Sequence, residues 1–183
     1  RLPKMLLMDA PPPHENTTSF QKMADLLSQA GLSVPQIYAC DHTHGFLLIE
    51  DFGALTYRTA LEEEVSEKML YEACVNALIH LHQKVTDNNA ALPSYSLELF
   101  LKEAEIFLEW YDLDCSAQAQ SDFRDLWTQV YEQQPIVPQS IVMRDVLVDN
   151  LMGLPSRIGL QRCGFLDFQD GVWGPVTYDL VSL

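Results

Sequence analysis

The sequence predicts an α+β fold with two lobes, a small N-terminal lobe that contains β-strands and a larger C-terminal lobe that is mainly helical. Short apolar runs bounded by turn-forming residues fill the first part of the chain, which is typical of strands. From about Thr59 onward, apolar residues recur at helical spacing over long segments. We expect the first lobe to cover residues 1–52 and the second residues 53–183, with a hinge near residues 50–53.

Turn and breaker residues set the expected elements of the first lobe. A proline-rich loop follows the first apolar run, because proline lacks the N–H donor that a strand ladder needs. Thr17 or Thr18 is expected to cap a helix that ends at Gly31. The apolar run Phe46–Glu50 follows a turn, so it is expected to form a hairpin with the strand before it. The expected strands are residues 4–8, 36–40 and 46–50.

Three long helices and a group of short strands are expected in the second lobe. The acidic run Glu62–Glu64 suits a helix N-terminus through the helix dipole, and this helix is expected to end near Lys84. Further helices are expected at residues 96–111 and 116–132, and strands at 141–143, 151–152 and 163–167. The side chains expected to face inward on the three helices are Val65, Met69, Ala73, Ala77, Leu81, Leu97, Phe100, Leu101, Ala104, Phe107, Leu108, Tyr111, Phe123, Leu126, Trp127 and Val130.

Composition argues against several classes of function. The net charge of −15 is unfavourable for binding nucleic acid, whose phosphates attract clustered Lys and Arg. No apolar run approaches the roughly 18 residues of a membrane span, and the first eight residues lack the features of a signal peptide. The cysteines are far apart, without a C-x-x-C pair, and each is expected to be a buried thiol: Cys40, Cys74, Cys115 and Cys163. We expect a cytoplasmic protein with neither a nucleic-acid nor a membrane partner, while its oligomeric state is unknown from the sequence.

The most informative motif combines two carboxylates with an amide. Arg144-Asp145 is followed after four residues by Asn150 and, beyond a predicted hairpin, by Asp167. A carboxylate such as Asp145 can orient an attacking hydroxyl and accept its proton, whereas Asn150 and Asp167 supply the oxygen ligands that Mg²⁺ prefers. Because an ionised side chain after a buried strand is costly unless it is paired, a metal ion is the expected partner of Asp167. The structural alternatives are a loop aspartate at 145 that caps its own backbone and an exposed hairpin corner at 167.

Further residues are expected to support this motif. Asp179 is expected to accept hydrogen bonds from the backbone of the loop that holds Asp145. Arg144 is either paired with a nearby carboxylate or exposed at the surface. Asp149 and Asp170 lie next to the motif and are expected to be solvated or to support it from outside.

The order of these groups resembles the aminoglycoside phosphotransferase and choline kinase superfamily. Within it, the chain is most similar to the bacterial branch of kinases that phosphorylate N-acetylmuramate and N-acetylglucosamine at the anomeric hydroxyl. The similar segments are residues 7–12, 30–35, 45–53, 110–111, 149–152, 164–170, 174–175 and 178–183.

The resemblance implies a protein-kinase-like fold, ATP or GTP as phosphoryl donor, Mg²⁺, and a sugar or amino-sugar acceptor. It implies Asp145 as the catalytic base and Asn150 and Asp167 as metal ligands. It also implies that the backbone of Glu50, Asp51 and Phe52 binds the nucleotide.

Several residues depart from the protein-kinase signature of His-Arg-Asp, Asn and Asp-Phe-Gly. Met143 stands for the His, Gln169 stands for the Gly, and the loop interior Val146–Val148 is apolar. No glycine precedes Gly31 to form a phosphate-covering loop, and Met8 lies where a phosphate-binding Lys would be sought. We therefore expect the first lobe to be truncated, beginning within its third strand. The open hypotheses are an active sugar kinase, a degenerate kinase-like protein that binds nucleotide or ligand without turnover, and an unrelated helical interaction domain.

Overall fold

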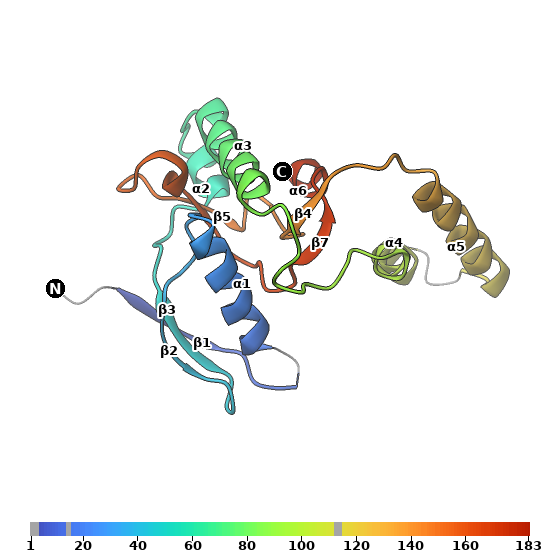
Figure 1. Ribbon diagram of the computed structural model, residues 1–183, viewed down its shortest axis with the longest axis horizontal. Coiled ribbons are helices and arrows are strands. Elements are labelled where there is room, and N and C mark those ends of the chain that lie inside the picture. The colour runs from blue at the N-terminus through green and yellow to red at the C-terminus, as the bar shows by residue number, and fades with distance from the viewer. Residues whose placement is uncertain (1–3, 14–15, 112–114) are drawn as a thin grey trace.

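The computed structural model describes residues 4–13, 16–111 and 115–183, and Figure 1 shows the arrangement of its elements. The predicted α+β fold is confirmed. Residues 1–3 lie outside the described residues. They belong to the first eight residues, which were expected to lack the features of a signal peptide. The elements are β1 (Met5–Asp9), α1 (Thr17–Gln29), β2 (Ile37–Asp41), β3 (Phe46–Glu50), α2 (Tyr57–Glu62), α3 (Glu67–Lys84), α4 (Leu97–Tyr111), α5 (Ala117–Glu132), β4 (Gln139–Val142), β5 (Leu151–Gly153), a 3₁₀ helix η1 (Gly159–Arg162), β6 (Cys163–Phe165), β7 (Val172–Pro175) and α6 (Tyr178–Ser182).

The N-terminal sheet is antiparallel, with the strand order β1-β3-β2, so the predicted hairpin of β2 and β3 is confirmed. Helix α1 lies over this sheet in Figure 1. Its cap is Asn16, whose side-chain oxygen accepts from the N–H groups of Thr18 and Ser19 at 3.0 and 3.1 Å. The prediction that Thr17 or Thr18 is the cap was therefore wrong. Thr17 is buried instead, with its hydroxyl 2.9 Å from Nδ1 of His42 in the turn after β2.

The turn between β2 and β3 depends on Gly45. Its φ of +80° is in the left-handed region, and its carbonyl accepts from the N–H of Ala10 at 2.8 Å. A Cβ atom at this position would lie only 2.2 Å from the backbone oxygen of Ala10. The end of β1 therefore packs directly against a residue that must lack a side chain.

We expect Gly45→Ala to lower the free energy of unfolding by about 2–4 kcal/mol, because backbone strain adds to the clash with Ala10. Gly159→Ala is the matched control, since Gly159 also has a positive φ (+57°) but no atom lies within 4 Å of the place that a Cβ would take. It should cost only about 1 kcal/mol. Urea denaturation of both variants measures the difference, and equal losses would contradict the packing argument.

The predicted helix that ends at Lys84 is divided into α2 and α3. The break covers Glu63 to Ser66, where Glu64 has a φ of +59° and Ser66 caps α3 by accepting from the N–H of Met69. The expectation that Glu62–Glu64 would begin a helix was wrong, because Glu62 ends α2 instead. The burial of Ala77 and Leu81 is confirmed, whereas Met69 is exposed.

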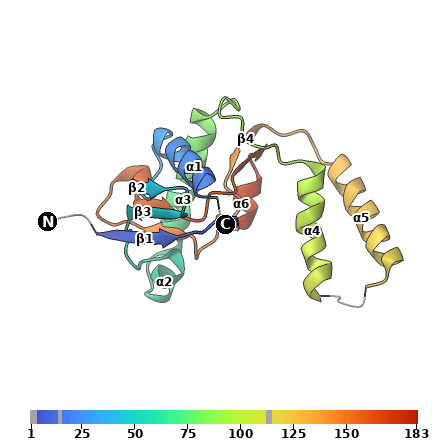
Figure 2. The same cartoon turned by 90° about the horizontal axis from the view of Figure 1, so that it is seen from below.

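Helices α4 and α5 form a hairpin that extends away from the rest of the molecule (Figure 2). Their bounds agree closely with the prediction, and Ser116 caps α5. Their predicted burial is confirmed at Leu101, but the other residues expected to face inward on these two helices are not buried. Of the fully described α4 and α5, Leu101 is the only buried residue, while Tyr111 is 78% exposed and Leu126 is 62% exposed. The apolar faces pack mainly on each other, as the stacking of Phe107 on Phe123 illustrates.

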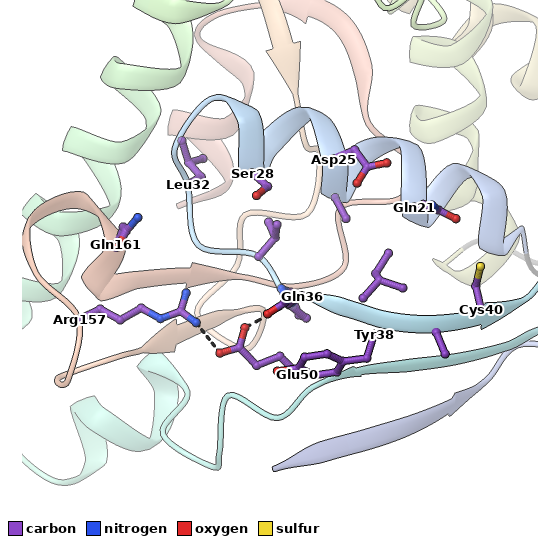
Figure 3. A pocket seen from close by; sticks show the side chains of 15 residues that line it. Gln21, Asp25, Ser28, Leu32, Gln36, Tyr38, Cys40, Glu50, Arg157 and Gln161 are labelled. Atoms are coloured by element: carbon purple, nitrogen blue, oxygen red, sulfur yellow. Dashed lines mark hydrogen bonds and ion pairs between the residues drawn. The ribbon is translucent and has the colours of Figure 1, made fainter. Parts of the chain in front are cut away.

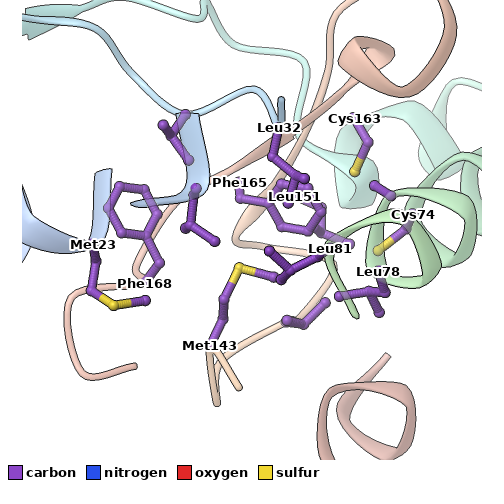
Figure 4. Close-up of a cluster of buried hydrophobic side chains, with 14 of the residues drawn as sticks. Met23, Leu32, Cys74, Leu78, Leu81, Met143, Leu151, Cys163, Phe165 and Phe168 are labelled. Carbon is purple, nitrogen blue, oxygen red and sulfur yellow. The ribbon is translucent and has the colours of Figure 1, made fainter. Parts of the chain in front are cut away.

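The main core lies where the segment around Asp145 meets α1 and α3 (Figure 4). Met143, Leu151, Phe165 and Phe168 are buried in this cluster. They flank the residues of the predicted motif, so the core fixes both ends of the loop that carries Asp145 and both sides of the following hairpin. This hairpin pairs β5 with β6 in antiparallel register, with Leu151 opposite Phe165.

The cysteines do not share one environment. Cys74 and Cys163 are buried, as predicted, but Cys40 is exposed and Cys115 is intermediate, so the prediction for these two was wrong. Cys40 lies on β2, an edge strand of the sheet, so less of the chain covers it. Within the described part of the chain, no helix is both long enough and apolar enough to cross a bilayer.

Candidate active site

The loop between β4 and β5 carries the predicted motif and has a tightly folded backbone. The N–H of Leu147 donates to the carbonyl of Asp145 at 2.9 Å, and the N–H of Asn150 donates to the carbonyl of Leu147 at 2.8 Å. Val146 is buried in the core. The buried side chain of Val146 therefore anchors this loop to the core.

The structure brings Asp145, Asn150 and Asp167 together. The side-chain N–H of Asn150 donates to the backbone carbonyl of Asp145 at 3.0 Å and lies 3.4 Å from Oδ2 of Asp167. The backbone carbonyl of Asn150 also accepts from the N–H of Leu166 at 2.9 Å, which extends the pairing of β5 and β6. The side chain of Asn150 thus links the backbone of its own loop to Asp167, which lies 17 residues further along the chain.

Asp167 is exposed, as in the alternative of an exposed hairpin corner, so the expectation that burial of its charge calls for a metal partner was wrong. The backbone turns outward after β6 because Asp167 has a φ of +56°. Its carboxylate accepts from the side-chain amide of Gln169 at 2.7 Å. A non-glycine residue in the left-handed region is under local strain, and such residues are often found at functional sites.

Asp145 is partly buried, and burial raises the pKa of its carboxyl group above the ordinary value. The nearby carboxylate of Asp167 raises this pKa further, whereas the guanidinium of Arg144 lowers it. The carboxyl group of Asp145 therefore lies where burial and a neighbouring carboxylate would favour a bound cation electrostatically.

Asp179, at the start of α6, accepts hydrogen bonds from the loop backbone, as predicted. Its two carboxylate oxygens accept from the N–H groups of Met143 and Arg144 at 2.9 and 3.0 Å. Asp179 is only 1% exposed. Burial raises the pKa of its carboxyl group to about 6, although the two backbone hydrogen bonds oppose this shift.

Arg144 pairs with a carboxylate, which was one of its two expected alternatives, but Glu103 was not predicted to be the partner. Its Nε and Nη2 atoms lie 2.9 and 2.6 Å from Oε1 of Glu103 on α4. The other oxygen of Glu103 accepts from the hydroxyl groups of Tyr95 at 2.5 Å and Tyr178 at 3.1 Å. A signal was present, because Glu103 interrupts an otherwise apolar face that includes Phe100 and Phe107.

The residues predicted to bind the nucleotide lie at the end of β3. Glu50 pairs with Arg157 and also accepts from the N–H of Gln36 at 3.3 Å (Figure 3). Arg157 lies over the ring of Phe52, 4.9 Å from its centroid. Asp51 accepts from the N–H of Gly53 at 2.7 Å. These side chains therefore stabilise the connection between the sheet and the β5–β6 hairpin. Nucleotide binding by the backbone of the same three residues stays a prediction.

A cavity of about 510 Å³ lies beside Glu50 and Arg157, between α1 and β2 (Figure 3). A second cavity, of about 460 Å³, lies between α4 and α5 and is lined by Tyr95, Phe100, Glu103, Ala104, Phe107, Phe123 and Trp127. The second cavity is therefore lined in part by Glu103, the carboxylate that pairs with Arg144.

Two other acidic residues near the motif lie outside this group. Asp149 forms an ion pair with Arg58, and both side chains are more than half exposed. Asp170 is exposed. Both observations agree with the expectation that these residues are solvated or support the site from outside.

The donor groups fit a divalent ion such as Mg²⁺. Asn150 is anchored through its N–H, which orients its amide oxygen, and Asp167 presents an accessible carboxylate. The described residues contain no cluster of three or more His, Cys, Asp or Glu that could enclose a metal ion. Two protein ligands are nevertheless sufficient for Mg²⁺, which commonly takes its remaining ligands from phosphate groups and water.

Comparisons with known proteins point to one family. The model for a family described as "Phosphotransferase enzyme family" matches residues 1–183. An N-acetylmuramate/N-acetylglucosamine kinase from Pseudomonas aeruginosa is 35% identical over 184 residues, which cover 98% of this chain and 52% of the relative. A protein with the same name from Neisseria meningitidis serogroup B is 33% identical, with 98% and 53% coverage. The chain thus spans about half the length of the curated relatives it matches.

Solved structures with a similar fold have lower sequence identity. A choline/ethanolamine kinase family protein from Mesorhizobium loti has a TM-score of 0.64 at 15% identity, and the similarity covers 100% of this chain and 58% of that one. The complex of gentamicin with APH(2")-IIa has a TM-score of 0.65 at 15% identity, with 98% and 63% coverage. These similarities support the predicted kinase-like fold.

Proposed function

We propose a function from one premise: the chain belongs to the phosphotransferase enzyme family, whose model matches its whole length. The proposed activity is transfer of the terminal phosphoryl group of ATP or GTP to a hydroxyl group of a sugar or amino sugar. The curated relatives are named as kinases of N-acetylmuramate and N-acetylglucosamine, which favours an N-acylated amino sugar as acceptor.

The observation that carries this proposal is the side chain of Asn150. It contacts both the backbone of Asp145 and the carboxylate of Asp167, so the proposed base and the proposed metal ligand share one neighbour. Phosphoryl transfer depends mainly on positioning and on neutralising charge, and this arrangement can supply both.

Each residue has a defined part in the proposed reaction. Asp145 orients the acceptor hydroxyl and takes its proton as the oxygen–phosphorus bond forms. The bond from the terminal phosphorus to the bridging oxygen breaks, and the nucleoside diphosphate leaves with that electron pair. Asn150 and Asp167 would hold Mg²⁺, which neutralises phosphate charge when bound. The backbone at Glu50, Asp51 and Phe52 would contact the base of the nucleotide.

The test is a turnover assay with ATP and with GTP, in the presence of Mg²⁺, across N-acetylglucosamine, N-acetylmuramate and an aminoglycoside. We expect a phosphorylated amino sugar, detected by ³¹P NMR, and loss of product on chelation of Mg²⁺. Phosphorylation of the aminoglycoside alone would contradict the proposed acceptor.

The same assay separates the alternative, a kinase-like protein that binds nucleotide without turnover. Replacement of the usual catalytic-loop His by Met143, which is buried in the core, favours this alternative. Nucleotide binding by calorimetry with no product for any acceptor would support it. Because the proposed reaction consumes a nucleoside triphosphate, we propose the cytoplasm as its compartment.

A further inference from the structure

Glu103 connects two parts of the molecule that otherwise meet at few places. It belongs to α4, whose hairpin with α5 extends away from the core (Figure 2). Its three hydrogen-bond donors come from Arg144 in the loop of Asp145, from Tyr95 before α4 and from Tyr178 at the start of α6, and Nη2 of Arg144 adds an ion-pair contact. A half-buried carboxylate with this many donors is held in one orientation.

Arg144 is the residue through which Glu103 acts. Its φ of +76° lies in the left-handed region, so its backbone needs support from its surroundings. Asp179 accepts a hydrogen bond from its N–H, and Glu103 holds its guanidinium with one hydrogen bond from Nε and an ion-pair contact to Nη2. The direction of the backbone at Arg144 determines where the next residue, Asp145, places its carboxylate.

We propose that Glu103 is a positioning residue that sets the orientation of Asp145 through Arg144, and so couples the α4–α5 hairpin to the site. The expected effect on turnover rests on the proposed function. The expected effect on the position of the loop rests only on the contacts of Glu103. Glu103 also lines the cavity between α4 and α5, so a molecule bound in that cavity would contact the same carboxylate that holds the loop.

The chain offers a matched control on the same helix. Glu105 also pairs with an arginine, Arg124 on α5, at 2.5 Å, and the two side chains are 33% and 39% exposed. This pair links α4 to α5 and has no part in the loop of Asp145. Glu105→Gln therefore removes an ion pair from α4 without removing the support of Arg144.

The experiment combines hydrogen exchange with kinetics for Glu103→Gln and Glu105→Gln. In Glu103→Gln we expect amides of residues 141–150 to exchange at least about tenfold faster, because their opening becomes easier. We also expect kcat to fall about 10- to 100-fold with little change in KM for the nucleotide, because a misplaced base slows the reaction step. Glu105→Gln should leave both quantities near the wild-type values, and Glu103→Asp should restore part of the loss.

The kinetic measurement and the exchange measurement test different parts of the proposal. If the wild-type chain phosphorylates no acceptor, the proposed function is wrong, and loop exchange still decides whether Glu103 positions the loop. Unchanged exchange in Glu103→Gln, or an equal increase in Glu105→Gln, would overturn the coupling. Normal kcat in Glu103→Gln with faster loop exchange would overturn its effect on Asp145. Should Glu103→Gln unfold, Tyr178→Phe removes one donor to Glu103 and is expected to give a smaller change of the same kind.

Discussion

Asp145→Asn is expected to lower kcat for phosphoryl transfer by about 10²- to 10⁴-fold, the usual range for loss of a general base. Asparagine has the same shape as aspartate, but its side chain cannot take the proton of the acceptor hydroxyl at neutral pH. The backbone carbonyl of residue 145, which accepts from Asn150, is retained in the variant. Nucleotide binding and folding should therefore change little.

Asp149→Asn is the control for this prediction. Asp149 lies in the same loop, but its carboxylate faces Arg58 at the surface. Steady-state kinetics of the two variants should separate them, with Asp149→Asn within about threefold of the wild type because exposed ion pairs contribute little. Near-normal turnover in Asp145→Asn would remove this residue from the chemistry.

Asp179→Ala is expected to have the largest effect on stability, lowering the free energy of unfolding by about 3–5 kcal/mol. The substitution leaves the N–H groups of Met143 and Arg144 without their acceptor in a buried place. Asp179→Asn keeps one acceptor oxygen and should cost less. Asp125→Ala, at an exposed position of α5, should cost about 0.5 kcal/mol or less and serves as the control in urea denaturation.

The pH dependence of stability gives a second measurement on Asp179. Its pKa in the folded chain, about 6, is above the ordinary value of 3.8. The folded state therefore binds the proton more tightly than the unfolded state between these values, and the contribution of Asp179 to stability falls as pH rises from about 4 to about 6. Asp179→Asn should lack this part of the slope, whereas an unchanged slope would contradict the raised pKa.

Local sequence patterns were sufficient for most elements of this fold. The apolar run at Phe46–Glu50 and the turn before it predicted the β2–β3 hairpin, because both signals are local. The break between α2 and α3 was not predicted, since glutamate gives no breaker signal at Glu64 although its φ is positive there. Helical periodicity identified the apolar faces of α4 and α5, but it could not indicate what covers them.

Some residues of the candidate site were predicted from the sequence, and others were not. The spacing of Asp145, Asn150 and Asp167 predicted that these residues meet, because a short hairpin returns the chain to its start. The part played by Asp179 was also predicted, and its hydrogen bonds confirm it. Glu103 was not predicted as the partner of Arg144, because the two are 41 residues apart and only tertiary packing joins them.

The central claim is that Asn150 and Asp167 hold a divalent ion beside Asp145. Its most direct test is a crystal structure with Mn²⁺ and a non-hydrolysable ATP analogue, in which anomalous scattering locates the metal. We predict a peak about 2.0–2.3 Å from the amide oxygen of Asn150 and from a carboxylate oxygen of Asp167, with phosphate oxygens as further ligands. A bound nucleotide whose metal contacts neither residue would contradict the account.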